Sequence, residues 1–315
     1  MRFLITGGRG FIGREVVSQL RRQGFEAVTS GRARSDTDTP QPISNEHVYI
    51  NRPEDPNEVQ SLLLNVRPDF IIHLAGSVSE SSLAELYQAN AVFAANILEG
   101  MTKMTLPPPI VLVGSAAEYG PVPDSSLPVS EGFDCCPNTS YGITKLAQTM
   151  HGLSAARAGL SVVIARVFNP IGPGMPTSLA LGSFAHQIAQ LDSTGGVLHT
   201  GDLSGVRDFI DVKETARLLI ELAKQRDAQG QIINVCTGLG VSLLDLTERL
   251  VACAGFPVEL RTNTNLRGNS KVNRLVGNPA KLHKLGLAPA PPVFDELLAD
   301  ILAFARERRC RAFKP

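Results

Sequence analysis

The sequence has no excess of charge of either sign. Thirty lysines and arginines balance thirty aspartates and glutamates over 315 residues. A protein that binds nucleic acid or a membrane surface normally carries a basic excess, so the balance disfavours both kinds of partner. Hydrophobic residues form 43% of the chain and charged residues 19%. This composition excludes long disordered segments and is ordinary for a soluble globular protein.

Cysteine and long apolar runs are also scarce. The five cysteines are odd in number and form neither a C-x-x-C motif nor a zinc pattern, so we expect reduced thiols, no metal and a cytoplasmic protein. The uncharged stretch 169–185 contains three prolines and three glycines and cannot form a membrane span. Because Met1 and Arg2 lead directly into an apolar segment, we expect no signal peptide.

Short apolar runs alternate with segments of helical periodicity. The pattern predicts strands over residues 3–6, 27–30, 47–50, 70–74, 110–113 and 161–167. It predicts helices over residues 12–22, 57–66, 83–104 and 141–158. Such alternation is typical of an α/β fold with a doubly wound parallel sheet. Right-handed crossovers would place any ligand at the carboxyl ends of the strands.

A glycine-rich loop follows the first strand and opens the first helix. Gly7 allows a tight turn, Gly10 lets a pyrophosphate approach the backbone, and Gly13 lets the helix pack close to the sheet. The amino end of the helix also attracts phosphate. The sequence therefore predicts a dinucleotide site. Its expected residues in this loop are Gly7, Arg9, Gly10, Phe11, Ile12 and Gly13.

The end of the second strand indicates which dinucleotide is bound. Enzymes that use NAD usually have an acidic residue there, about 20 residues after the glycine loop, to bind the ribose hydroxyl. Here the chain reads Ser30-Gly31-Arg32, without an acid. Arg32 and Arg34 could bind a 2′-phosphate, with Ser30 as a further donor and Arg9 directed to the same region. We therefore predict NADP(H), while NAD(H) stays possible; alternatively, Arg32 and Arg34 belong to a solvated loop.

A tyrosine and a lysine are expected to share one face of a helix. Tyr141 and Lys145 are four residues apart, and Ser115 follows an apolar strand at the carboxyl edge of the sheet. These side chains could reduce a carbonyl. The phenol of Tyr141 would donate a proton, Ser115 would donate a hydrogen bond to the same oxygen, and the Lys145 charge would lower the pKa of the phenol.

Several motifs together make the chain similar to a known family. They are TGGRGFIG at 6–13, HLAGSV at 73–78, the helix around Asn90, VGSAAEYG at 113–120, YGITK at 141–145, RVFNPIGPG at 166–174 and RDFIDV at 207–212. With them the chain resembles the extended short-chain dehydrogenases/reductases, also called the NAD-dependent epimerase/dehydratase family. The resemblance implies a Rossmann fold and a catalytic set of Ser115, Tyr141 and Lys145.

The same resemblance implies further binding residues. Leu74 and Ala75 would line the cofactor cleft, which Tyr141 and Lys145 would also contact. A nucleotide-sugar substrate would contact Ser115, Asn169, Arg207 and Arg267. We expect an NADP-binding domain over residues 1–168, to which 209–255 return, and a smaller domain over 169–315 that mainly binds substrate. Family dimers pack long helices into a four-helix bundle, which implies a homodimer.

The residues after Ser115 indicate the branch of the family. Dehydratases of this family place a carboxylate directly after the catalytic serine or threonine, whereas Ala116 and Ala117 cannot titrate. Glu118 comes one place too late, and along an extended segment its side chain would face the other way. The chain is most similar to GDP-4-keto-6-deoxymannose reductases. It would thus reduce a nucleotide-linked 4-keto-6-deoxyhexose with hydride from NADPH, with Tyr141 as proton donor.

Two other functions stay open from the sequence. A nucleotide-sugar 4-epimerase would use the same serine, tyrosine and lysine, but it usually retains NAD, and no acid follows the second strand. A non-catalytic NADP-binding regulator would be expected to have lost the tyrosine or the lysine, and both Tyr141 and Lys145 are present.

Overall fold

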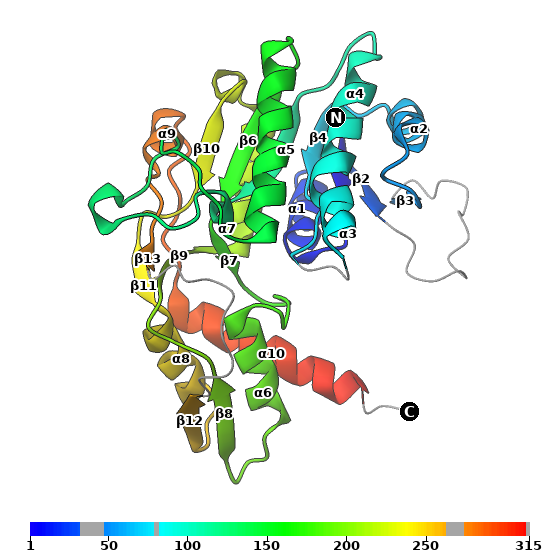
Figure 1. Cartoon of the computed structure of the whole chain (residues 1–315). Helices are drawn as coiled ribbons and strands as arrows, with labels where there is room; N and C mark the ends of the chain where they lie inside the picture. The colour runs from blue at the N-terminus through cyan, green and yellow to red at the C-terminus, as the bar shows by residue number, and fades with distance from the viewer. Residues whose placement is uncertain (32–46, 79–81, 263–273, 313–315) are drawn as a thin grey trace.

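Seven parallel strands form the central sheet of the molecule (Figure 1). The structure is a computed structural model that describes residues 1–31, 47–78, 82–262 and 274–312. The strands are β1 (Arg2–Thr6), β2 (Glu26–Gly31), β3 (His47–Tyr49), β4 (Phe70–His73), β5 (Ile110–Ser115), β6 (Val162–Val167) and β10 (Ile232–Val235). Their order is β10-β6-β5-β4-β1-β2-β3. The chain therefore winds outward in both directions from β1 and β4, and the predicted doubly wound α/β fold is confirmed.

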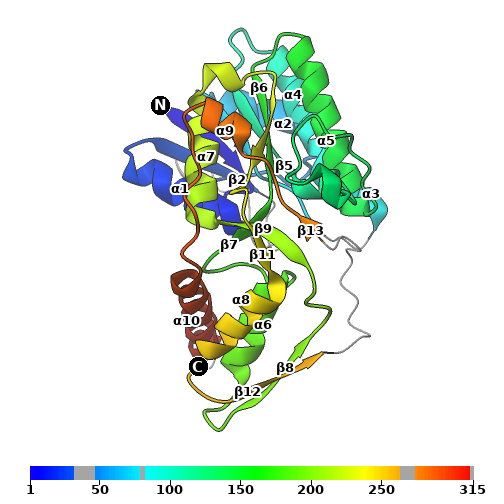
Figure 2. The same ribbon diagram turned by 90° about the vertical axis from the view of Figure 1, so that its left-hand side faces the viewer.

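Helices cover both faces of this sheet, which explains why its strands are almost wholly apolar. Helices α1 (Phe11–Arg22) and α7 (Val212–Lys224) pack on one face. Helices α2 (Pro56–Val66), α4 (Phe93–Thr102) and α5 (Ser140–Arg157) pack on the other, as Figure 2 shows.

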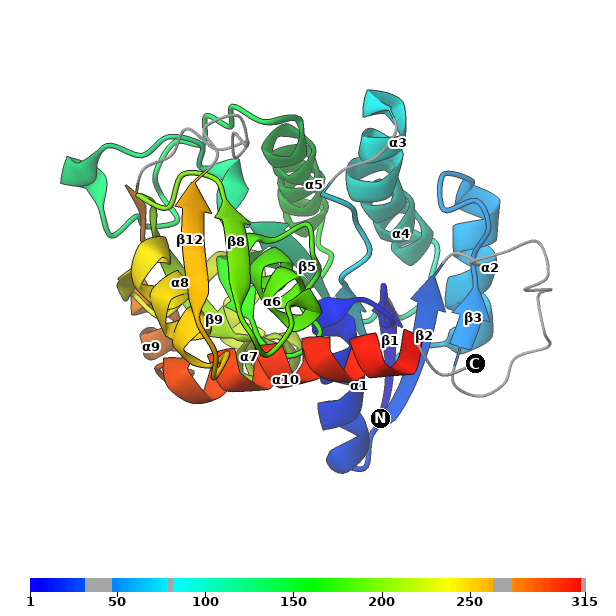
Figure 3. The ribbon, with the colours of Figure 1, turned by 90° about the horizontal axis from the view of Figure 1, so that it is seen from below.

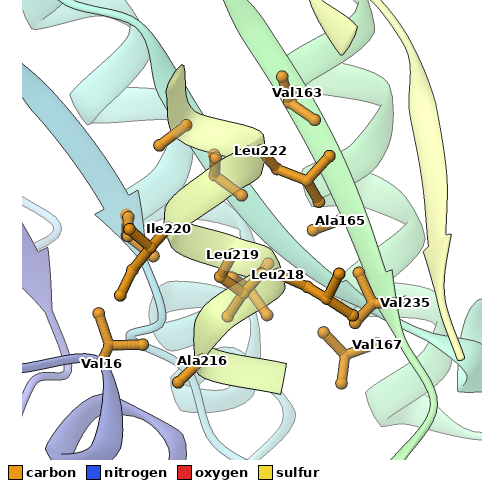
Figure 4. Packing of buried hydrophobic residues seen from close by; sticks show 14 of the residues in the cluster. Val16, Val163, Ala165, Val167, Ala216, Leu218, Leu219, Ile220, Leu222 and Val235 are labelled. Atoms are coloured by element: carbon orange, nitrogen blue, oxygen red, sulfur yellow. The ribbon is translucent and has the colours of Figure 1, made fainter. Parts of the chain in front are cut away.

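In strand β6, successive side chains point to opposite faces of the sheet, so one strand contributes to the cores on both sides. Val163, Ala165 and Val167 join the cluster on the α7 side, where they lie opposite Leu218 and Leu222 (Figure 4). The alternate residues Val162 and Ile164 join the other cluster, and all five strand residues are buried. Strand β10 pairs with β6 and adds a seventh strand at this edge.

The long helix predicted over residues 83–104 is divided into three consecutive parts. Helix α3 (Leu83–Tyr87) starts with a capping box between Ser82 and Glu85 and continues into a π-helical segment, η1 (Gln88–Val92). Helix α4 follows without a break and ends at Thr102. π-Helical turns are rare in proteins, and those that occur are often found at functional sites. The buried polar side chain of Asn90 lies in this turn.

A second group of elements lies beyond the carboxyl ends of the large sheet. Strands β7 (Asn169–Ile171), β11 (Gly240–Ser242) and β13 (Arg274–Leu275) all pair with β9 (Val206–Asp211). Strands β8 (Gly196–Thr200) and β12 (Val258–Thr262) pair with each other. Sequence patterning predicted none of these six strands, because they are short and none of them is a continuous apolar run.

Three helices build a separate apolar core in this second group of elements, which lies at the bottom of Figure 1 and is called the lower region below. Helices α6 (Ala180–Gln190), α8 (Leu243–Ala252) and α10 (Phe294–Ala312) contribute Phe184, Leu250 and Leu298, among others, and Figure 3 shows them from below. The chain returns to the large sheet with α7 and β10, and a short helix, α9 (Ala280–Lys284), packs on β10. Helix α8 belongs to the lower core. The division of the chain into a cofactor domain and a substrate domain stays a prediction.

Within the described part of the chain, no helix combines the length and the apolar character that crossing a bilayer requires.

Candidate active site

The loop after β1 and the loop after β4 are in direct contact at the carboxyl end of the sheet. Gly7 has a φ of +70°, and a Cβ at this position would lie 2.8 Å from the backbone nitrogen of Ala75. Gly13 packs just as closely, because its Cβ would lie 2.3 Å from the carbonyl oxygen of Gly7. The glycines predicted for a turn and for close helix packing therefore have those geometries.

The side chain of Thr6 joins the same two loops. Its Oγ1 accepts a hydrogen bond from the Ala75 backbone nitrogen at 3.2 Å and lies 2.8 Å from Nδ1 of His73. Burial and the nearby Lys145 charge lower the pKa of His73 to about 3, so this imidazole is neutral. His73 is a packed core residue at the strand end.

A cavity of about 350 Å³ lies over these loops. Of the residues predicted to bind the cofactor, it is lined by Gly7, Arg9, Gly10, Ser30, Leu74 and Ala75. Ile12 lines the neighbouring cavity, whereas Phe11 and Gly13 contribute to helix α1 and line neither. Arg32 and Arg34 lie outside the described residues.

The residues present fit a dinucleotide on two independent observations. The Oγ of Ser30 is buried and has no hydrogen-bond partner among the described residues, although Ser30 lines the cavity. Helix α1 starts at the cavity with Gly10 as its N-cap, so no side chain caps it and no acidic residue lies in its first turn. Free backbone N–H groups at a helix start are suited to bind phosphate.

Arg9 is held at the mouth of this cavity by an aromatic residue. Its Nη2 donates to the Tyr49 hydroxyl at 3.1 Å, and its guanidinium lies 5.1 Å from the centre of the Tyr49 ring. Tyr49 thus holds the guanidinium over the cavity that Ser30 also lines, and no acidic side chain in the described part of the chain pairs with it.

A second cavity, of about 160 Å³, adjoins the first and shares Leu74, Gly76 and Ser77 with it. Ser115, Tyr141 and Lys145 all line this cavity. Ser115 ends β5, and the other two lie one turn apart on α5, whose N-cap is Thr139. The structure therefore brings the three predicted catalytic side chains together beside the glycine loop.

The protonation states of these groups are set mainly by burial. The pKa of Tyr141 is raised, mainly by burial and in addition by the Glu118 charge. A hydrogen bond with Ser115 acts in the opposite direction and lowers it. Burial lowers the pKa of Lys145 to about 8. The Lys145 ammonium donates to Oε1 of Gln148 at 2.5 Å. The sequence led us to expect that the Lys145 charge lowers the pKa of the phenol; instead this pKa is raised, and the removal of the phenol from water is the largest cause.

Asn90 was not among the predicted site residues, yet it fixes the loop between the two cavities. Its Oδ1 accepts from the Ser77 backbone nitrogen and its Nδ2 donates to the Ser77 carbonyl oxygen, both at 2.8 Å. Nδ2 also lies 2.9 Å from Oγ1 of Thr144 on α5. The sequence signal for this role is one polar residue within the stretch 89–95, whose other residues are all apolar.

Two of the predicted substrate-binding residues, Asn169 and Arg207, lie on strands β7 and β9 of the second group. The Asn169 side chain donates to the Asp208 carbonyl oxygen at 2.8 Å, and the adjacent Pro170 lines the second cavity. Arg207 lies on β9 and donates to the Val206 carbonyl oxygen at 3.0 Å. Neither Asn169 nor Arg207 is among the residues that line the two cavities. Arg267 lies outside the described residues.

The expectation for Glu118 was wrong. Residues Ala116–Glu118 form a 3₁₀ turn (η2) instead of an extended segment, so the Glu118 side chain folds back toward Ser115. It is fully buried and forms an ion pair with Arg166 at 2.9 Å. A carboxylate held in this way is not available to the second cavity.

In the described ranges, no group of three His, Cys, Asp or Glu side chains is arranged to hold a metal ion.

The sequence over residues 3–236 matches the model of the NAD dependent epimerase/dehydratase family. The chain belongs to this family. The nicotinamide cofactor that the glycine loop predicts is therefore confirmed at the level of the family, as is the resemblance on which the site residues were assigned.

Individual family members are similar over most of the chain. The dTDP-6-deoxy-L-talose 4-dehydrogenase (NAD(P)(+)) of Kitasatospora kifunensis is 31% identical, over 82% of this chain and 81% of its own. The GDP-6-deoxy-D-mannose reductase of Pseudomonas aeruginosa is 30% identical, over 69% and 73%. The solved structure of RMD from Pseudomonas aeruginosa, complexed with NADPH, superposes with a TM-score of 0.82 at 25% identity, covering 98% of this chain and all of that one.

The contacts of Asn90 yield a testable prediction. Asn90→Ala leaves the Ser77 backbone and the Thr144 hydroxyl without this partner, so the free energy of unfolding should fall by about 2–3 kcal/mol. Affinity for the dinucleotide should also fall, because Ser77 lines both cavities. Chemical denaturation and cofactor titration measure the two effects. As a control, Gln225→Ala removes only a bond to the Leu285 carbonyl oxygen and should leave cofactor affinity unchanged.

Proposed function

We propose that this protein is an NADPH-dependent reductase of a nucleotide-linked 4-keto-6-deoxyhexose, such as GDP-4-keto-6-deoxymannose. The observation that carries the proposal is the convergence of Ser115, Tyr141 and Lys145 on a cavity that adjoins the glycine-loop cavity. The reductase and dehydrogenase relatives, which act at C4 of deoxyhexoses in the case of the talose enzyme, support the substrate class.

Each proposed catalytic residue has a role that its surroundings favour. Because burial raises the pKa of Tyr141, the phenol keeps its proton at neutral pH and can donate it to the carbonyl oxygen. Ser115 donates a hydrogen bond to the same oxygen and stabilises the negative charge that develops there. Lys145, with a pKa of about 8, stays mostly protonated at neutral pH and contributes a positive charge beside Tyr141. Bound NADPH would supply the hydride.

The surroundings of Ser115 favour reduction over dehydration. Elimination of water needs a carboxylate that can accept a proton from the sugar. Ala116 and Ala117 cannot titrate, and the Glu118 carboxylate is buried against Arg166. We assign the sugar and diphosphate contacts to Asn169, Arg207 and Arg267, the residues that the family resemblance implies.

The activity is tested with purified protein, NADPH and GDP-4-keto-6-deoxymannose. We expect loss of NADPH absorbance in a one-for-one ratio with ketosugar, and a product heavier by one hydride and one proton. Tyr141→Phe should reduce turnover by roughly 100-fold or more without changing cofactor affinity. Tyr87→Phe is the matched control, since Tyr87 lies on α3 and lines neither cavity. Interconversion of two sugars of equal mass without loss of NADPH would instead establish the 4-epimerase.

The preference for NADPH is assigned to Arg9, Ser30 and Arg32. Arg9→Ala should weaken NADPH binding by about tenfold or more, the effect of losing one charge-assisted hydrogen bond, and should change NADH binding much less. Arg32→Ala should have the same selectivity. Titration of both cofactors measures this, with Arg22→Ala as a control at the far end of α1, where Arg22 pairs with Glu15. An equal effect on both cofactors would refute the assignment.

We also propose that the protein is a homodimer through α3 and α5, as the family resemblance implies. Three large apolar side chains on these neighbouring helices are exposed: Leu83 by 57%, Ile143 by 44% and Met150 by 54%. Ile143 and Met150 are two turns apart and so lie on one face of α5. Light scattering should give the mass of two chains for the wild type and of one chain for Ile143→Asp/Met150→Asp. A monomeric wild type would exclude the dimer.

A further inference from the structure

A buried ion pair lies directly behind the residues proposed to be catalytic. The Glu118 side chain is fully buried and that of Arg166 is 1% exposed. Arg166 donates from Nε at 3.1 Å and from Nη2 at 2.9 Å, both to Oε2 of Glu118. Burial of two charges is costly unless further hydrogen bonds satisfy them. A pair of this kind therefore calls for a reason beyond stability.

Both oxygens of Glu118 are bound to elements that carry the site. Oε1 accepts from the backbone nitrogen of Ser115 at 2.7 Å. Oε2 accepts from the Thr149 hydroxyl on α5 at 2.8 Å, in addition to Arg166 on β6. One carboxylate thus connects the end of β5, the helix of Tyr141 and Lys145, and strand β6.

Two glycines make this arrangement possible. A Cβ at Gly114 would lie 2.4 Å from Oε1 of Glu118, and a Cβ at Gly142 would lie 2.4 Å from the Ala117 carbonyl oxygen. The glycine in β5 leaves room for the carboxylate, and the glycine in the first turn of α5 lets the helix lie against the 3₁₀ turn. A displacement of Glu118 would therefore move Ser115 and α5 relative to each other.

We propose that Glu118 is a positioning residue, which fixes Ser115 and helix α5 in one geometry through its two oxygens and places a negative charge behind Tyr141. The inference rests on the proposed function only in naming Ser115, Tyr141 and Lys145 as the catalytic residues.

The electrostatic part of the proposal has a definite sign. Tyr141 is faced by Ser115 from β5, Glu118 from η2 and Lys145 from its own helix, with Arg166 on β6 behind Glu118 and the neutral His73 on β4 near Lys145. The Glu118 charge raises the pKa of both Tyr141 and Lys145. It thereby favours the protonated state of both groups, which proton donation requires.

The first experiment reads Tyr141 directly and needs no substrate. The chain has four tyrosines and no tryptophan, so the pH dependence of phenolate absorbance, taken as the difference between a protein and its Tyr141→Phe counterpart, isolates Tyr141. In Glu118→Gln we expect the pKa of Tyr141 to fall by about 1. The alkaline limit of turnover should also move to lower pH, because the Glu118 charge raises the pKa of Lys145 as well.

A matched control removes a carboxylate elsewhere. Glu214→Gln breaks the ion pair with Arg217 and weakens the bond from the Ala290 backbone nitrogen, both at the buried start of α7 and away from the two cavities. It should lower the stability of the protein and leave the Tyr141 titration unchanged. A folded Glu118→Gln variant with a wild-type Tyr141 titration would overturn the electrostatic part.

A second variant tests positioning and keeps the buried charges paired, in case Glu118→Gln does not fold. Thr149→Val removes the hydroxyl that ties α5 to Glu118 and leaves the Arg166 pair intact. We expect kcat to fall by about tenfold with an unchanged KM for NADPH, and Thr149→Ser, which keeps the hydroxyl, to restore it. Wild-type kcat in Thr149→Val would overturn the positioning role. Absence of wild-type turnover would refute the proposed function instead, and the tyrosine titration would still decide the role of Glu118.

Discussion

The hydroxyl of Thr6 joins the two strand ends on which the whole site is built. By contacting both His73 and the Ala75 backbone, it fixes the loop after β4 against the glycine loop after β1. The strand order reverses between these two neighbours, so their loops diverge to opposite faces and leave a crevice over the sheet. Gly7 lets the loops meet with no side chain between them. Both cavities depend on this contact, because the residues after β4 line each of them.

Helix α5 is the second constraint, and it is held from two sides. Asn90 in the π-helical turn reaches Thr144, while Glu118 reaches Thr149 five residues further along the same helix. The two polar contacts are buried, where an unsatisfied partner would be costly, so each specifies one position of the helix. The helix that carries Tyr141 and Lys145 is thus positioned by contacts that neither residue makes itself.

The chemistry that the site can perform follows from burial as much as from residue type. A buried phenol that keeps its proton and a lysine with a pKa of about 8 form a donor and a neighbouring cation at neutral pH. The Glu118 carboxylate pairs with Arg166 and accepts from the backbone of Ser115, and its charge raises the pKa of both Tyr141 and Lys145.

The sequence alone determined the features that depend on neighbours along the chain. Apolar runs and helical periodicity located every strand of the large sheet from β1 to β6 and four of its covering segments, now seen as α1, α2, α3 to α4, and α5. The glycine spacing and the Tyr141–Lys145 spacing located the cavities' main residues, because each motif lies within a single turn or loop. The tertiary structure alone decided the role of Glu118, which pairs with Arg166 forty-eight residues away, and of Asn90, which meets Thr144 fifty-four residues away. It also decided the short strands β7 to β9 and β11 to β13, whose pairing comes from distant segments. Contacts over such separations depend on how crossover helices place the strands, and no local pattern of residues records that placement.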